Sequence, residues 1–158
     1  MKKTITLLFF TISSIAHSVA ATFTVTNTND TGAGSLRQAI INANAATDAD
    51  VINFNIPGTG PFTIAPLSVL PSITNPVVIN ALTQPGASVG NPAIVLNGAS
   101  AGTTADGLLV FATNSTIQGL VINGFSRYGI FLIGGSNSVI SNYIGTDISG
   151  TTAVANGV

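Results

Sequence analysis

The sequence predicts an all-β solenoid, a parallel β-helix, preceded by one short helix. Short apolar runs recur at intervals of roughly 20 residues between turns rich in glycine and asparagine, which is the pattern of a solenoid. Only 6% of the residues are charged, and threonine, serine, asparagine and glycine occupy the polar positions instead. That composition favours long, regular β structure with many tight turns, and only one stretch has helical periodicity.

Residues 1–20 have the three regions of a secretory signal peptide. Lys2 and Lys3 form a basic start, an apolar core runs to Ile15, and small residues follow in AHSVAA. Ser18 and Ala20 fit the positions three and one before a cleavage site. We therefore expect cleavage after Ala20, although a cut one residue later fits nearly as well. The apolar core is shorter than the roughly 20 residues that cross a bilayer, so we expect a cleaved signal and a secreted or cell-surface protein.

Removal of residues 1–20 leaves a weakly acidic chain with few ionisable side chains. Two arginines against five aspartates give a formal charge of −3, and there is no glutamate or cysteine. The single histidine, His17, is lost with the signal. This balance provides no basic surface for nucleic acid or for an anionic membrane, and no membrane span is expected after signal removal. No nucleophile–base pair can be assembled, and stability must come from packing instead of disulfides.

The N-terminal elements are predicted from periodicity and capping. TFTVTNT (22–28) alternates, which predicts a half-buried strand with Phe23 and Val25 on one face. GSLRQAIINANA then predicts a helix, with Ser35 as the N-cap and Gln38 completing a capping box. The apolar residues of this helix form one stripe, which must dock on an apolar surface: Leu36, Ala39, Ile40 and Ala43.

The segment that follows is turn-rich. Strands are expected near Val51–Ile56 and Pro61–Ile64, joined by a Pro/Gly turn. All seven prolines lie between Pro57 and Pro92, which excludes long helices there.

The rest of the chain repeats. Two similar segments start at Gly107 and at Gly129, a spacing of 22, and one inserted residue then aligns Ile117 with Ile140 at a spacing of 23. The same alignment matches Asn114 with Asn137 and Val121 with Ile144. An earlier pair, NPVVINA (75–81) and NPAIVLNGA (91–99), repeats at a spacing of 16 to 17. We expect the paired apolar residues to stack inward in parallel strands, and we expect asparagines at bends to bond between coils: Asn80, Asn97 and Asn123.

Two other solenoids have periods in this range. A leucine-rich repeat requires regularly placed leucines, which this chain lacks, and a calcium-binding nonapeptide roll requires GGxGxDxx repeats, of which GGSNS is only a distant likeness. Glycine and asparagine at the turns favour the parallel β-helix, because these residues adopt left-handed conformations readily.

Several segments together resemble a known family. TFTVTNTNDTGAGSLRQAIINAN, INFNIPGTGPFTI, TQPG and STIQGLVINGFSRYGIFLIGGSNSVISNYIGTDISGT are similar to secreted bacterial right-handed parallel β-helix repeat proteins of the pectin-lyase-like type. In that family a strand and an SLR-[EQ]-AI helix cap the first coil. The likeness covers nearly all of the chain after the signal, but Gly34 stands where the family often has a cysteine.

The resemblance implies a right-handed superhelix within large exported or cell-surface proteins, and it does not imply lyase activity. We divide the chain into a signal peptide (1–20), an N-terminal cap (21–74) and β-helix coils (75–158). The sequence stops at Val158 within what reads as a further coil, so we expect a truncated stack. We expect its open coil edge to pair with further coils or with another chain.

The candidate contact residues are few. Arg127 and Tyr128, in GFSRYG between two expected strands, are the candidates for contact with glycans. Arg37 could also meet an acidic glycan, but a surface or cap-bonding role is favoured for a lone charge on a short helix. Asp30, Asp48 and Asp50 could supply oxygens to calcium, but turn aspartates are favoured. No catalytic, cofactor-binding or metal-binding residue is assigned, and no cofactor is expected.

The predicted function is that of a non-catalytic structural segment, stalk-like or adhesin-like, with glycans or host or surface proteins as partners. The alternative is a carbohydrate-binding or polysaccharide-cleaving β-helix whose active residues lie beyond this chain. Cleavage within this chain is not expected, because two arginines and five scattered aspartates cannot fill the acid, base and metal roles together.

Overall fold

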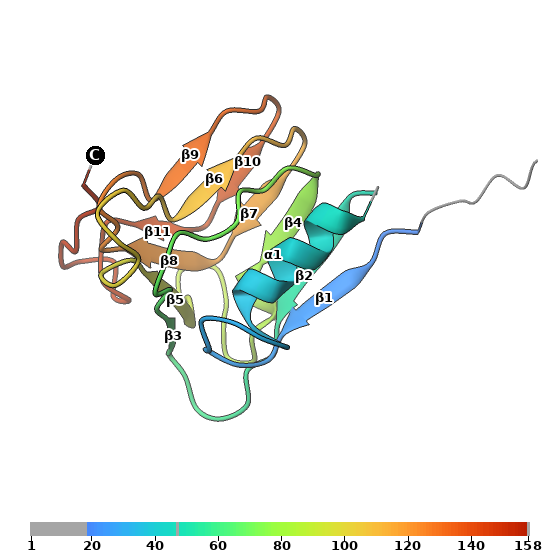
Figure 1. Ribbon diagram of the computed structural model, residues 1–158. Helices are drawn as coiled ribbons and strands as arrows, with labels where there is room; N and C mark the ends of the chain where they lie inside the picture. Colours follow the sequence, from blue (N-terminus) through green and yellow to red (C-terminus); the bar gives the residue numbers. More distant parts are fainter. Residues whose placement is uncertain (1–18, 47, 158) are drawn as a thin grey trace, which may run out of the picture.

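The computed structural model describes residues 19–46 and 48–157, which form short strands in parallel sheets and one α-helix (Figure 1). Residues 1–18, most of the expected signal peptide, lie outside the described residues. In chain order the elements are β1 (Thr22–Val25), α1 (Leu36–Ala45), β2 (Asp50–Phe54), β3 (Phe62–Ile64), β4 (Val77–Asn80), the 3-10 turn η1 (Ala81–Thr83), β5 (Ile94–Asn97), β6 (Leu108–Val110), β7 (Thr116–Gln118), β8 (Leu120–Asn123), β9 (Ile130–Leu132), β10 (Ser138–Ile140) and β11 (Tyr143–Ile144).

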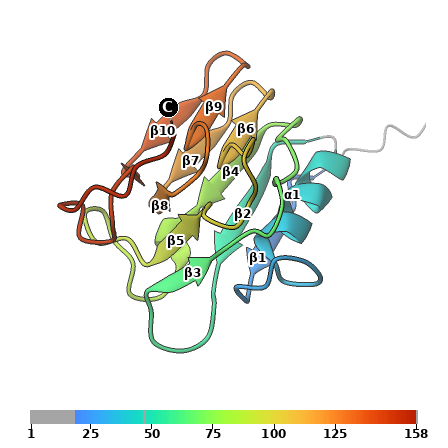
Figure 2. The ribbon, with the colours of Figure 1, turned by 60° about the vertical axis from the view of Figure 1, so that its left-hand side comes forward.

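The strands form three sheets, in the orders β1-β2-β4-β7-β10, β3-β5-β8-β11 and β6-β9. Every strand pair described is parallel, as the sequence predicted. Figures 1 and 2 show strands that are distant in sequence lying side by side in each sheet. Aliphatic side chains from all three sheets meet in one core cluster, whose burial supplies the main stabilisation.

The predicted helix is confirmed, and so is its buried stripe. Leu36, Ala39, Ile40 and Ala43 are all buried, and α1 packs on β1 and β2. The Ser35 hydroxyl accepts a hydrogen bond from the Gln38 backbone N–H at 3.2 Å. The capping box is only half correct, because the Gln38 side chain donates to Asn42 and the Ser35 N–H donates to the carbonyl of Gly32.

The register of the last strands, β10 and β11, differs from the sequence alignment that contains one inserted residue. Ile117 pairs with Val139, while Ile140 pairs with Gln118. Ser115 N–H donates to the Asn137 side chain, 22 positions on. Paired residues of neighbouring strands therefore remain 22 positions apart after the turn. The predicted stacking of Ile117 on Ile140 is therefore wrong by one residue, and a one-residue slip turns a side chain to the other face of a strand.

The same slip affects the next strand pair. Val121 pairs with Tyr143, and Ile144 pairs with Ile122. Leu120 N–H donates to the Asn142 side chain, also 22 positions on. The expected pairing of Val121 with Ile144 is therefore also wrong by one residue.

The shorter repeat, between NPVVINA and NPAIVLNGA, does not correspond to stacked coils. Its two apolar runs become β4 and β5, which lie in different sheets. Val78 in β4 pairs with Thr116, and Ile94 in β5 pairs with Leu120. The two runs are thus successive strands along the chain, and their similarity reflects the shared pattern of an inward-facing strand that ends at an asparagine.

One of the expected asparagine contacts is present, between the neighbouring strands β5 and β8. Asn97 and Asn123 are in register, and the Asn97 side chain donates to the side-chain oxygen Oδ1 of Asn123 at 2.8 Å. Asn80 does not join this pair, because its side chain accepts from the N–H of Leu82 and caps η1.

Apolar side chains of the last strands, β9, β10 and β11, are exposed. Leu132, Val139 and Ile144 are 39%, 37% and 45% exposed, although their register partners in the neighbouring strands are buried: Val110, Ile117 and Ile122. We call these three exposed residues, with part-buried Ile130, the terminal apolar face.

In the part of the chain that the structure describes, no helix has the length and hydropathy needed to cross a membrane.

Candidate glycan-contact surface

Arg127 and Tyr128 lie in the connection between β8 and β9, beside the two-stranded sheet. Leu108 and Val110 of β6 point into the core, so Leu109 between them points outward. Phe131 of β9 is the register partner of Leu109 and shares this outer face. The outer face of this sheet is therefore apolar, unlike the outer face of the five-stranded sheet, where β7 presents Thr116 and Gln118.

Tyr128 and Phe131 form an aromatic pair at this surface. Their ring centres lie 4.8 Å apart at an interplanar angle of 35°. The guanidinium carbon of Arg127 lies 5.7 Å from the centre of the Tyr128 ring, within range of a cation–π contact. Tyr128 is 36% exposed, so its ring remains accessible to solvent.

Asp106 holds this loop in place. Its carboxylate lies 3.6 Å from the Arg127 guanidinium and accepts a hydrogen bond from the Tyr128 N–H at 3.1 Å. The Arg127 side chain is 45% exposed while that of Asp106 is 7% exposed, so Asp106 is a buried anchor. Of the two aspartates in the repeats, the structure brings Asp106 to Arg127, whereas Asp147 bonds within its own turn.

The surface combines apolar side chains with the Arg127 guanidinium, whose charge is balanced by Asp106. Aromatic side chains present a large rigid area with a polar tip, which suits contact with the C–H face of a sugar ring. Asp106 offsets the Arg127 charge, which weakens any attraction for an acidic polymer. Phe131 was not recognised as a member of the site from the sequence, although strand alternation from Gly129 onward would have placed it outward.

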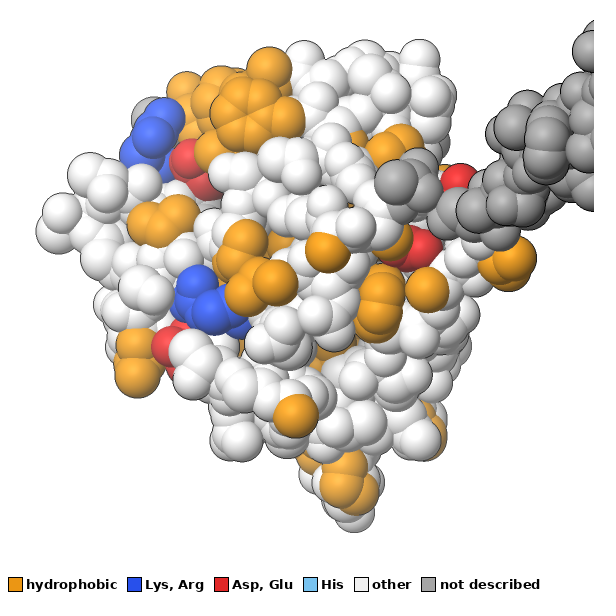
Figure 3. All heavy atoms as spheres, turned by 45° about the vertical axis from the view of Figure 1, so that its right-hand side comes forward, with side chains coloured by type: hydrophobic (Ala, Val, Ile, Leu, Met, Phe, Trp, Pro, Cys, Tyr) orange, Lys and Arg blue, Asp and Glu red, His pale blue; other side chains and the backbone are white. Residues whose placement is uncertain are grey.

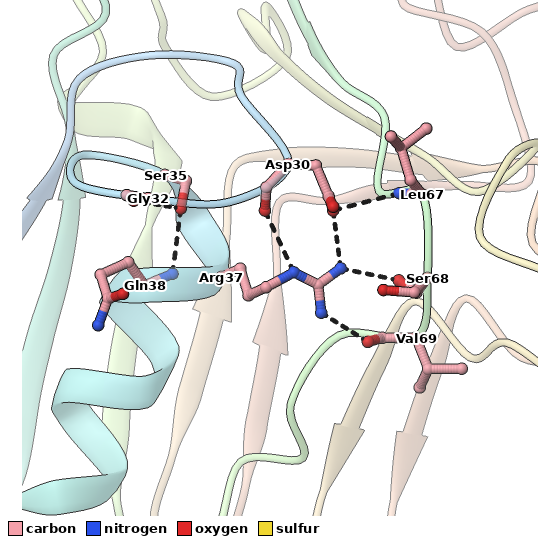
Figure 4. Close-up of polar contacts among 8 residues, drawn as sticks. All are labelled: Asp30, Gly32, Ser35, Arg37, Gln38, Leu67, Ser68 and Val69. Atoms are coloured by element: carbon pink, nitrogen blue, oxygen red, sulfur yellow. Dashed lines mark hydrogen bonds and ion pairs between the residues drawn. The ribbon is translucent and has the colours of Figure 1, made fainter.

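Arg37 is a structural crosslink and is not free to meet a glycan. Its guanidinium forms an ion pair with Asp30 at 2.7 Å and donates to the backbone carbonyls of Ser68 and Val69 (Figure 4). Its side chain is only 13% exposed. The hydrogen bond from Arg37, with a further one from the Leu67 N–H, holds the pKa of Asp30 below its usual value despite partial desolvation. The turn before α1 is thereby joined to the segment before β4.

The candidate calcium aspartates do not come together. Asp30 is committed to Arg37, and Asp50 is fully buried in β2. No group of three or more metal-ligating side chains occurs within the described residues.

Asp147 accepts a hydrogen bond from the Ser149 hydroxyl at 2.7 Å, which lowers its pKa most, and the N–H groups of Thr152 and Thr151 lower it further.

A shallow cleft of about 410 Å³ lies on another part of the molecule, lined by the segments that precede β3 and β5 and by Ile148. Its walls contain glycine, proline, alanine, threonine, asparagine and isoleucine, with no ionisable side chain. The cleft therefore contains no group for acid–base or nucleophilic chemistry.

No protein-family model matches this chain, and no curated protein matches it in sequence. The functional interpretation therefore depends on the geometry of the chain itself.

Proposed function

We propose that this chain is a non-catalytic structural segment of an exported protein of the right-handed parallel β-helix type, with a stalk-like or adhesin-like role. The observation that carries the proposal is the stack of parallel strands in three sheets. In its last coils, strands at a spacing of 22 continue the same inward columns. Such stacks present long regular surfaces, which suit presentation and spacing.

The use of the ionisable side chains supports a structural role. Asp30 and Arg37 crosslink the cap, and Asp106 and Arg127 hold the loop before β9. Asp147 organises its own turn. Side chains committed in this way are poorly placed to act as an acid, a base or a metal ligand.

The terminal apolar face supports association at one end of the stack. Leu132, Val139 and Ile144 are exposed there, and β10 and β11 are edge strands of their sheets. Exposed edge strands with apolar side chains pair readily with further strands. Further coils, or another chain, would bury this face.

Export is tested by expressing residues 1–158 in a bacterial host and determining the N-terminal residue of the protein outside the cytoplasm. We expect a chain that begins at Ala21. Ala20→Phe is the control, because a large residue at the position before the cut prevents cleavage. Recovery of the uncleaved protein in the cytoplasm would contradict the proposal.

The Tyr128–Phe131 pair favours a second function, carbohydrate binding at the outer face of the β6-β9 sheet. Here the chain would contact a polysaccharide through the aromatic pair, with Arg127 and Asp106 as polar neighbours. This corresponds to the binding half of the carbohydrate alternative, and any cleavage would depend on residues beyond this chain.

Binding of residues 21–158 to immobilised neutral and acidic polysaccharides separates the two functions. Saturable binding that Tyr128→Ala abolishes and Tyr128→Phe retains would favour the carbohydrate function, since phenylalanine keeps the ring. A purely stalk-like role expects no saturable binding that depends on this ring.

A further inference from the structure

The backbone nitrogen of Ala21 meets a carboxylate. Its N–H donates to Asp50 Oδ1 at 2.7 Å. The carbonyl oxygen of Ala21 accepts from the N–H of Val51 at 2.9 Å, and Thr22, the next residue, pairs with Val51 in the β1–β2 ladder. The position of the Ala21 nitrogen is thus set by backbone pairing.

Asp50 is a buried carboxylate with unused bonding capacity. The residue is 0% exposed, and Oδ2 has no hydrogen-bond partner among the described residues. Asp48, two positions earlier, also has a buried oxygen without a partner there. A buried carboxylate that lacks a counter-charge is costly, because it has lost water and gained only one hydrogen bond.

The described side chains supply no spare cation. Arg37 is paired with Asp30, and Arg127 is paired with Asp106. On the face that Figure 3 shows, basic side chains lie next to acidic ones. From Ala21 onward the sequence contains no lysine and no histidine. The remaining cation available to a chain that begins at Ala21 is its own α-amino group.

We propose that cleavage after Ala20 creates this cation in place, and that the α-ammonium of Ala21 forms a buried ion pair with Asp50. Hydrolysis breaks the Ala20–Ala21 peptide bond. The hydroxyl of water goes to the Ala20 carbonyl carbon and a hydrogen goes to the Ala21 nitrogen, which then takes up a proton at neutral pH. One amide donor becomes an ammonium with three, which can serve both oxygens of Asp50. Signal removal thereby completes the packing of β1 on β2.

The pairing also selects between the two cleavage sites. A cut after Ala21 would place the amine on Thr22, about 3.3 Å further along the strand, and would remove the nitrogen that contacts Asp50. This inference rests on the proposed export, and it assigns the cut to the Ala20–Ala21 bond.

The pairing is tested with two forms of the protein that differ only at the start. One begins at Ala21, and the other begins at Val19, so that its amine is displaced by two residues and the Ala21 nitrogen is an amide. Both are prepared from a fusion that a protease cleaves to leave the native residue first. Because this route does not depend on natural export, a failure here is distinct from a failure of the export proposal.

Asp50→Asn is introduced into each form, and thermal unfolding midpoints are compared. In the form that begins at Ala21, Asp50→Asn should lower the midpoint by about 4 °C or more. In the form that begins at Val19 it should have no such effect or should raise the midpoint, since it removes an unpaired buried charge. The matched control is Asp106→Asn, which removes the charge of the buried aspartate that pairs with Arg127. This substitution should change the unfolding midpoint equally in both forms.

A second measurement uses the absence of lysine, because the α-amine is then the only primary amine in the form that begins at Ala21. Its reaction with an amine-acylating reagent should be several-fold slower in the folded protein than in the unfolded chain. Asp50→Asn should restore much of the rate if the variant folds. Equal effects of Asp50→Asn in the two forms, or an amine that reacts as fast folded as unfolded, would overturn the proposal.

Discussion

Charged residues in this chain act mainly as crosslinks between segments that are far apart in sequence. Arg37 joins the turn before α1 to residues 68 and 69 through an ion pair and backbone carbonyls. Hydrogen bonds to a charged group contribute about 1.5–3 kcal/mol each, more than neutral ones do. Both arginines and most of the aspartates of the described residues contact another segment or organise a turn.

The Asp30–Arg37 pair predicts a pH dependence of stability. Because Arg37 lowers the pKa of folded Asp30, the pair stabilises the protein above the unfolded pKa of about 3.9, and this contribution is lost as the pH falls through the lowered value. Asp30→Asn should flatten the fall of the urea midpoint between about pH 5 and pH 2. In an Arg37→Ala background the same substitution should have little effect, and an equal effect in both backgrounds would contradict the pairing.

At the scale of the element, α1 is held by its apolar stripe more than by its intrinsic helix propensity, since a ten-residue helix is marginal alone in water. Leu36 is 1% exposed, whereas Ile41 on the same helix is 44% exposed. Leu36 therefore represents the buried side of this helix, and Ile41 represents its solvent-facing side.

Leu36→Asp should lower the free energy of unfolding by about 2–4 kcal/mol, because it removes a buried aliphatic side chain and buries a charge. Ile41→Asp is the matched control and should change stability by no more than about 0.5 kcal/mol. Chemical denaturation measures both. An unchanged midpoint for Leu36→Asp would show that α1 does not cover the core.

The paired strands β7 and β10 give a second comparison between a buried and an exposed residue. Ile117 and Val139 are register partners in the adjacent strands β7 and β10, yet they are 1% and 37% exposed. Ile117→Ala should cost about 2–5 kcal/mol, whereas Val139→Ala should cost less than about 1 kcal/mol. Similar losses in a denaturation series would mean that the last coil is covered in solution, for example by a second copy.

At the scale of the whole molecule, the ionisable side chains of the described residues are dispersed over separate turns, the helix α1 and the strand β2. Asp106 and Arg127 form one pair, Asp30 and Arg37 form another, and Asp147 lies in a third turn. Elimination across a uronic acid requires a base, neutralisation of the carboxylate and usually a metal. One ion pair cannot fill these roles.

Residues 21–158 should therefore not cleave polygalacturonate or alginate, with or without calcium. The assay follows the absorbance of unsaturated product over many hours. Steady product formation that disappears in Arg127→Ala would contradict the structural proposal and favour a catalytic one.

Features that depend on local chemistry could be predicted from the sequence. Ser35 was recognised as an N-cap and the stripe of α1 as buried, because capping and helical periodicity involve residues only a few positions apart. Strand positions followed from alternation, and their parallel pairing followed from the repeat that starts at Gly107 and Gly129. The positions of Arg127 and Tyr128 in an exposed loop were also predictable, because glycines mark both of its ends.

Local residue patterns thus specified the helix, the strands and their parallel pairing. Which residues contact each other was decided only by the tertiary structure. Thr116 is in register with Ser138 on one side and with Val78 on the other, at spacings of 22 and 38. Since loop lengths vary this much, local patterns do not specify the register, and one inserted residue in the alignment misplaced Ile140. The contacts of Arg127 with Asp106 and of Ala21 with Asp50 span 21 and 29 positions. They exist because backbone pairing between parallel strands brings those positions together.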